Sequence, residues 1–109
     1  MHWVNKYIGK HSYNCGSLVY NVLKNEFNKE MPEVNANNIL EISKLTKKIK
    51  KPEHGAIAIM KNDNSHIGLY LKYDGGGILH CLEKTGVIFQ THAHLRSNGW
   101  KTINYYKLK

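Results

Sequence analysis

Cysteine, proline and acidic side chains are all scarce in this chain of 109 residues. Two cysteines are too few for the disulfide framework of a small secreted domain. We therefore expect both thiols to be reduced, with a single Cys15–Cys81 bridge as the alternative. No run is long and apolar enough for a transmembrane segment, and "MHWVNKYIGK" lacks the apolar middle of a signal peptide. These absences predict synthesis in the cytoplasm without a signal peptide.

The charge balance is strongly basic. Sixteen Lys and Arg residues face eight Asp and Glu residues, which gives a formal net charge of +8. Such an excess favours an anionic partner, whether nucleic acid, anionic lipid or a polyanion of a bacterial envelope. The length fits one domain over residues 1–109, and 41% hydrophobic residues suffice for a modest core.

The first clear element is a helix that begins at Cys15. Asn14 is a candidate N-cap, and apolar residues then recur at spacings of three and four, namely Leu18, Val19, Val22, Leu23 and Phe27. Cys15 lies three and four residues before Leu18 and Val19, so it belongs to the same inward stripe. Pro32 follows soon after the expected end of this helix.

A second, shorter helix is predicted after Asn37 or Asn38, with Ile39, Leu40, Ile42 and Leu45 as its apolar residues. It runs into "KLTKKIKK" (44–51), which we interpret as a solvated helix end because cations complement the helix dipole there. The functional alternative is a dock for an anionic envelope polymer or a tail-tip protein, formed by Lys44, Lys47, Lys48, Lys50 and Lys51.

After Pro52 the pattern becomes that of strands. We predict strands over 55–60, 66–73, 78–83, 87–95 and 102–108, separated by turns such as "NDNS" and "DGGG". Helices followed by an antiparallel sheet make an α+β fold, with N-terminal helices packed on a C-terminal sheet. His92 and His94 would share one face of the 87–95 strand. A half-exposed strand explains this pair better than a metal site, because no further ligand is placed by spacing.

Three residues form a candidate catalytic set. A free thiol is mostly protonated at pH 7, so a cysteine nucleophile needs a neighbouring imidazolium and a third group that orients the ring. His66 opens a predicted strand and shares a face with Gly68, which we expect to leave room for the Cys15 helix. His80 lies one strand later, where it can hold the second nitrogen of His66. Cys81 alternates to the opposite face and is expected in the core.

This order resembles the NlpC/P60 family of papain-like cysteine peptidases. The resemblance rests on "CGSLV" at the helix start, the strand "SHIGLYL" and the later "ILH". "LHCLEKTGVIF" and "LRSNGWKTINYYKLK" look like the ending of versions found in phage tail-tip assembly proteins. The chain departs from the family pattern in having Asn14 before the cysteine, the order Gly16-Ser17 after it, Ala56 after Gly55, and a short lead-in "KHSY".

The resemblance implies an enzyme that cleaves peptide or amide bonds of peptidoglycan stem peptides through an acyl-enzyme, without a cofactor or a metal. Cys15, His66 and His80 would be catalytic, and Tyr13, Gly16 and Ser17 would lie at the substrate. The protein would act at the cell wall, on a phage tail or as a delivered effector. The departures leave its substrate preference open.

Three alternatives remain open. The first is a structural tail-assembly protein that keeps the fold without catalysis. The second is a related hydrolase or acyltransferase that acts on a substrate outside the wall. The third is a basic nucleic-acid-binding module, which we do not expect because it leaves the order of cysteine and histidines unexplained.

Overall fold

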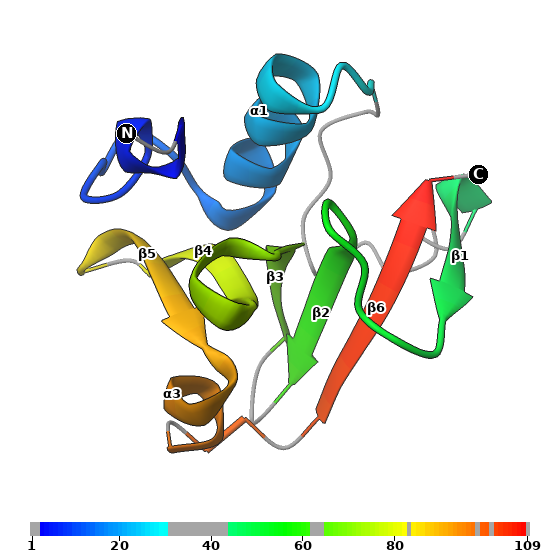
Figure 1. The fold of residues 1–109 in the computed structure, drawn as a ribbon. Coiled ribbons are helices and arrows are strands. Elements are labelled where there is room, and N and C mark those ends of the chain that lie inside the picture. The colour runs from blue at the N-terminus through cyan, green and yellow to red at the C-terminus, as the bar shows by residue number, and fades with distance from the viewer. Residues whose placement is uncertain are drawn as a thin grey trace.

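The computed structural model describes residues 3–30, 44–61, 65–82, 84–97, 99–100 and 102–108. Six strands form one antiparallel sheet in the order β1-β6-β2-β3-β4-β5. They are β1 (Thr46–Ile49), β2 (Ile57–Lys61), β3 (Ser65–Leu71), β4 (Gly77–Leu82), β5 (Gly86–Thr91) and β6 (Thr102–Leu108). The helices are α1 (Cys15–Glu26) and α3 (His92–Ser97), with short 3-10 turns η1 (Trp3–Lys6) and η2 (Tyr73–Gly75). The protein is thus a small mixed α/β fold (Figure 1).

Helix α1 begins at Cys15, and a reciprocal pair of hydrogen bonds fixes that start. Asn14 Oδ1 accepts a hydrogen bond from the Ser17 backbone N–H at 2.8 Å, and Ser17 Oγ accepts one from the Asn14 backbone N–H at 2.9 Å. Such a capping box satisfies amide groups that an α-helix leaves without partners at its N-terminus. The predicted helix start and N-cap are confirmed, and Cys15 occupies the first helical position.

The sheet has two covered faces. On one, the apolar stripe of α1 packs against alternate residues of β2, β3 and β4, and α1 lies over β3 and β4 (Figure 1). This cluster includes Leu18, Val19, Val22, Leu23, Ile57, Ile67, Leu69, Leu79 and Cys81. The other face holds a second cluster built on Ala58, Met60, Tyr70, Ile78 and Leu95, with Trp100 and Ile103 at its margin. Strand alternation assigns His66, Gly68 and His80 to this second face.

In the lysine-rich segment 44–51, Lys44 and Leu45 are helical, as predicted, but Thr46–Ile49 form the strand β1, so the prediction of a helix end is wrong from Thr46 onward. Residues Thr46–Ile49 pair along β6, with Thr46 opposite Leu108 and Ile49 opposite Tyr105. β1 forms one edge of the sheet, and exposed lysines at an edge oppose pairing with further strands. The earlier part of the expected second helix, up to residue 43, lies outside the described residues, and only its end at Lys44 and Leu45 is seen to be helical.

The strand predicted over 87–95 ends at Thr91, and His92–Ser97 is the helix α3. Its only buried residue, Leu95, joins the second core cluster, and the backbone N–H of Gly99 donates to the Arg96 carbonyl with Gly99 at φ +79°. This left-handed glycine is a common helix ending. His92 and His94 are thus two residues apart on a helix, so the shared strand face expected for them is wrong. The other predicted strands are confirmed with small changes at their ends, whereas most of the "NDNS" turn, 62–64, lies outside the described residues.

Candidate functional site

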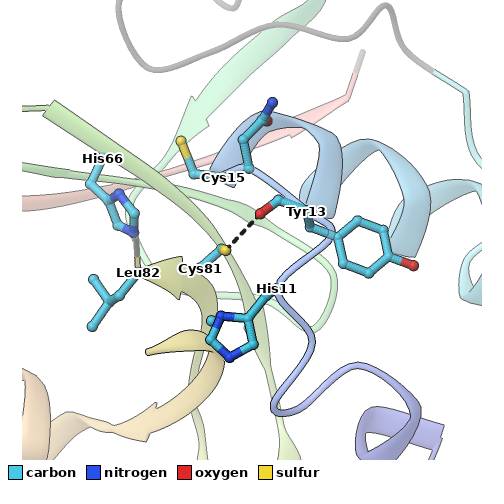
Figure 2. Close-up of a pocket in the computed structure, with 8 residues that line it drawn as sticks. His11, Tyr13, Cys15, His66, Cys81 and Leu82 are labelled. Carbon is cyan, nitrogen blue, oxygen red and sulfur yellow. Dashed lines mark hydrogen bonds between the residues drawn. The ribbon is translucent and has the colours of Figure 1, made fainter. Parts of the chain in front are cut away.

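A cavity of about 610 Å³ lies at the start of α1. Cys15 and His66 both line it, and Figure 2 shows His66 to the side of the start of α1, where Cys15 lies. Cys15 is half-buried, so part of it is accessible at the cavity that it lines. The structure therefore brings together the thiol and the imidazole that the sequence paired, although they are separated by about half of the chain.

The second predicted pair is also brought together. The Nε2 atom of His66 lies 2.9 Å from the Nδ1 atom of His80, within hydrogen-bond distance. The two rings meet edge to face, with centroids 5.0 Å apart and planes at 78°. His80 has no exposed surface, whereas His66 is half-buried at the cavity. His80 is therefore placed to orient the ring of His66 through its second nitrogen, as expected.

Gly68 serves a different purpose from the one predicted. It pairs with His80 across β3 and β4, and a Cβ atom at Gly68 would lie 2.6 Å from Ile78 Cγ2 and 3.0 Å from His80 Cβ. These neighbours belong to β4, not to α1, which packs on the opposite face of the sheet. The expectation that Gly68 makes room for the Cys15 helix is wrong. Glycine at this position lets β4 bring His80 beside His66.

Two further residues belong to the site and were missed by the sequence analysis. Gln90 of β5 places its Oε1 atom 2.7 Å from the Nε2 atom of His80. Trp100 stacks on His66, with ring centroids 5.6 Å apart and planes at 16°, and its ring is nearly perpendicular to that of His80 at 6.5 Å. Alternation along β5 places Gln90 on the face of Ile88, which is paired with His80. This alternation is the only feature of the sequence that could have pointed to Gln90. No comparable feature pointed to Trp100.

Burial makes this histidine pair weakly basic. It lowers the pKa of His66 from 6.5 to about 4, and the nearby charge of His80 acts in the same direction. Burial also lowers the pKa of His80, an effect that its contact with Gln90 partly offsets. Both rings are consequently neutral at pH 7. The standing imidazolium expected beside the sulfur is therefore wrong for the free protein, and His66 is instead a neutral base.

The three residues predicted to contact substrate have different positions. Tyr13 lines the cavity, but Figure 2 shows its ring directed away from His66, and it packs near Tyr7 with centroids 6.0 Å apart. Ser17 is engaged in the helix cap, and Gly16 is buried in α1. Neither Gly16 nor Ser17 is among the residues that line the cavity.

The rest of the cavity wall was not assigned to the site by the sequence. It is formed by His11, Asn14, Leu82, Gly86 and Cys81. Cys81 is buried in the core cluster, as predicted, yet it also reaches the cavity, where its Sγ donates to the Tyr13 carbonyl at 2.9 Å (Figure 2). Burial, with a contribution from the nearby Cys15, raises the pKa of Cys81. Both cysteines are free in this structure, and both line the cavity.

The five lysines of the proposed dock are all exposed, and none of them lines this cavity. β6 and β2 separate their strand, β1, from β3 in the sheet. Among the described residues there is no group of three or more His, Cys, Asp or Glu side chains that could hold a metal ion. Nor does any helix in the described part of the chain have both the length and the apolar character needed to cross a membrane.

Comparison with known proteins adds no assignment. The chain matches no protein-family model, and no curated protein sequence is significantly similar to it.

Proposed function

We propose that this protein is a cysteine hydrolase of the papain-like NlpC/P60 type that cleaves peptide or amide bonds in peptidoglycan stem peptides. The observation that carries the proposal is the cavity at the start of α1. It holds a half-buried thiol, Cys15, together with His66, whose Nε2 atom lies 2.9 Å from His80. A nucleophile and a base in one accessible cavity, with an orienting group buried behind the base, are the elements that covalent acyl transfer requires.

The geometry suggests the first chemical step. His80 occupies the Nε2 atom of His66, so the Nδ1 atom is the one available to the thiol. As the Cys15 sulfur forms a bond with the substrate carbonyl carbon, its proton passes to His66 Nδ1. The carbonyl oxygen then carries the negative charge. The backbone N–H of Cys15, at the N-terminus of α1, is the proposed donor to that oxygen.

The second half of the reaction reverses the proton path. The tetrahedral intermediate collapses, the carbon–nitrogen bond breaks, and His66 returns its proton to the departing amine. A water molecule, deprotonated by His66, then attacks the thioester and releases the acid product and the Cys15 thiol. Because His66 is neutral in the free protein, it acts as a general base during attack. This differs from a preformed thiolate and imidazolium pair.

The basic edge of the sheet suggests how the enzyme is held at its substrate. Lys44, Lys47, Lys48, Lys50 and Lys51 are exposed around β1, away from the cavity. We propose that they dock the protein on an anionic envelope polymer or on a tail-tip protein while the cavity remains open. Binding to purified cell walls should then weaken as salt is raised. Replacing Lys47, Lys48 and Lys50 by Gln should weaken it similarly and leave cleavage of a small soluble stem peptide unchanged.

The test is digestion of purified peptidoglycan followed by mass spectrometry of the released muropeptides. The wild-type protein should release new amino termini, and the near-isosteric Cys15→Ser variant should release none above background. Ser97→Ala, an exposed hydroxyl loss on α3, is the matched control and should retain activity. Cleavage by Cys15→Ser at the wild-type rate would overturn the mechanism. A folded wild-type protein that cleaves no stem peptide would favour the structural tail protein.

A further inference from the structure

The hydrogen-bond chain behind the catalytic base continues past His80 and ends at Gln90. The distances are 2.9 Å from His66 Nε2 to His80 Nδ1 and 2.7 Å from His80 Nε2 to Gln90 Oε1. The three side chains come from three neighbouring strands, β3, β4 and β5. His80, in the middle, is completely buried, so water does not compete for either of its ring nitrogens.

From this chain we infer that Gln90 is a positioning residue, which fixes the tautomers of both histidines so that His66 presents a bare Nδ1 atom to Cys15. An amide oxygen can only accept a hydrogen bond, so the Nε2 atom of His80 must carry the hydrogen. A neutral imidazole has one N–H, which leaves Nδ1 of His80 as an acceptor. His66 must then donate from Nε2, and its Nδ1 atom keeps the lone pair that takes the thiol proton.

The same arrangement serves both protonation states of His66. When His66 gains a proton at Nδ1, its Nε2–H still donates to His80, and no hydrogen bond has to reverse. The opposite tautomer of His80 would donate from Nδ1 to His66 Nε2. His66 would then carry its hydrogen on Nδ1 and could not act as the base. Gln90, which never contacts the reacting atoms in this scheme, decides between these two states.

Among the described residues around His66, no charged side chain is present to fix its protonation state. On β2 the residue opposite His66 is the apolar Met60, and Trp100 covers the ring on one side. The titratable groups that share the cavity with His66 are His11, Tyr13, Cys15 and Cys81, and His80 lies behind it. No Asp, Glu, Lys or Arg among the described residues lines the cavity. The lowered pKa values of both histidines agree with a chain that ends in a neutral amide.

This inference rests on the proposed function for its catalytic meaning, but its first test needs no substrate. Histidine-ring ¹⁵N NMR of the wild-type protein at pH 7.5 should show both His66 and His80 as the Nε2–H tautomer. Gln90→Leu, which keeps the side-chain bulk and removes the acceptor, should abolish this preference at His80. Gln90→Glu retains an acceptor and should restore it. Thr91→Val, a polar loss on the same strand, is the matched control and should leave both tautomers as in the wild type.

Kinetics separate positioning from a structural role. Gln90→Leu should lower the rate of Cys15 alkylation by iodoacetamide, and kcat/KM for wall cleavage, by at least about tenfold with KM nearly unchanged. Gln90→Glu should recover activity at pH 8. The acid limb of its pH–rate profile should move to higher pH, because a carboxylate at position 90 favours the protonated form of the histidine pair. Thermal melting identifies variants that fail to fold. If Gln90→Leu does not fold, the role of Gln90 is tested by the tautomers of the wild-type protein and by the pH–rate profile of Gln90→Glu.

The two possible failures are distinguishable. An Nδ1–H tautomer of His80 in the wild-type protein, or a folded Gln90→Leu variant with wild-type tautomers and alkylation rate, would overturn the role of Gln90 whether or not peptidoglycan is cleaved. Wild-type protein with the expected tautomers but no cleavage of peptidoglycan would instead overturn the proposed function and leave the positioning role standing.

Discussion

Replacing Trp100 by Ala should raise the pKa of His66. The indole ring lies nearly parallel to the His66 ring at 5.6 Å and is also in T-shaped contact with His80, so its removal should admit water to the imidazoles. Burial is the largest cause of the lowered pKa of His66, about 4 compared with 6.5 for an unperturbed histidine. Removing one wall of this environment should therefore shift the pKa of His66 upward by at least about one unit.

The size of the effect on stability follows from the same shift. The folded and unfolded pKa values of His66 differ by about 2.5 units, which corresponds to about 3–4 kcal/mol at about 1.4 kcal/mol per unit. Because the unfolded chain binds the proton more tightly, the free energy of unfolding falls as pH is lowered from 6.5 to 4. Above pH 6.5 this group causes no further change. The lowered pKa of His80 acts in the same direction.

The measurements are an NMR titration of His66 and urea unfolding at several pH values between 7.5 and 4.5. In Trp100→Ala, the free energy of unfolding should depend less on pH than in the wild type. The acid limb of the pH profile for Cys15 alkylation should move to higher pH. Trp100→Phe keeps an aromatic cover and should stay close to the wild type in both. A wild-type pKa of 6 to 7 for His66, or a Trp100→Ala variant in which that pKa falls, would refute the reasoning.

Three further predictions concern local structure and thiol reactivity. Gly68→Ala should destabilise the fold by about 1–3 kcal/mol, because its Cβ would lie 2.6 Å from Ile78 Cγ2. A loss of stability below about 0.5 kcal/mol in urea unfolding would contradict the close packing of β3 and β4. Asn14→Ala should cost about 1 kcal/mol through loss of the helix cap, whereas Asn14→Asp should retain most of it, as measured by thermal unfolding. At pH 7, iodoacetamide should label Cys15 well before Cys81, because the Cys81 thiol is buried and hydrogen-bonded and its pKa is raised. Equal labelling of the two cysteines in peptide mass spectra would contradict this.

The parts of the fold that the sequence predicted correctly depend on local patterns. The stripe from Leu18 to Phe27 with Asn14 before it defines α1, because spacing and capping act within a few residues. The strands around "SHIGLYL" and "ILHCLE" follow in the same way, and the short turn between them brings His66 beside His80. Each of these features is set by neighbours in the chain.

The predictions that failed depend on packing between distant segments. The predicted helix runs on through segment 44–51, yet β6 offers a free edge with which Thr46–Ile49 pairs, so the helix ends at Leu45. In 87–95 the alternating pattern also accommodates a helix that inserts Leu95 into the second core cluster. For Gly68, the expectation of a close neighbour was correct, but the neighbour is β4 instead of α1. The hydrophobic periodicity and the composition of a segment do not determine which distant segment of the chain it will pack against.

The protonation state of the site was also out of reach of the sequence, for a related reason. The order of Cys15, His66 and His80 suggests a thiolate stabilised by an imidazolium, because a single histidine near a cysteine in water would be partly charged. Trp100, which comes from the segment before β6, covers His66 and thereby disfavours its charged form. Gln90 then ends the hydrogen-bond chain with a neutral acceptor where a carboxylate would have favoured that charge. Two residues that no motif contains thus determine whether the histidine acts as a resident cation or as a neutral base.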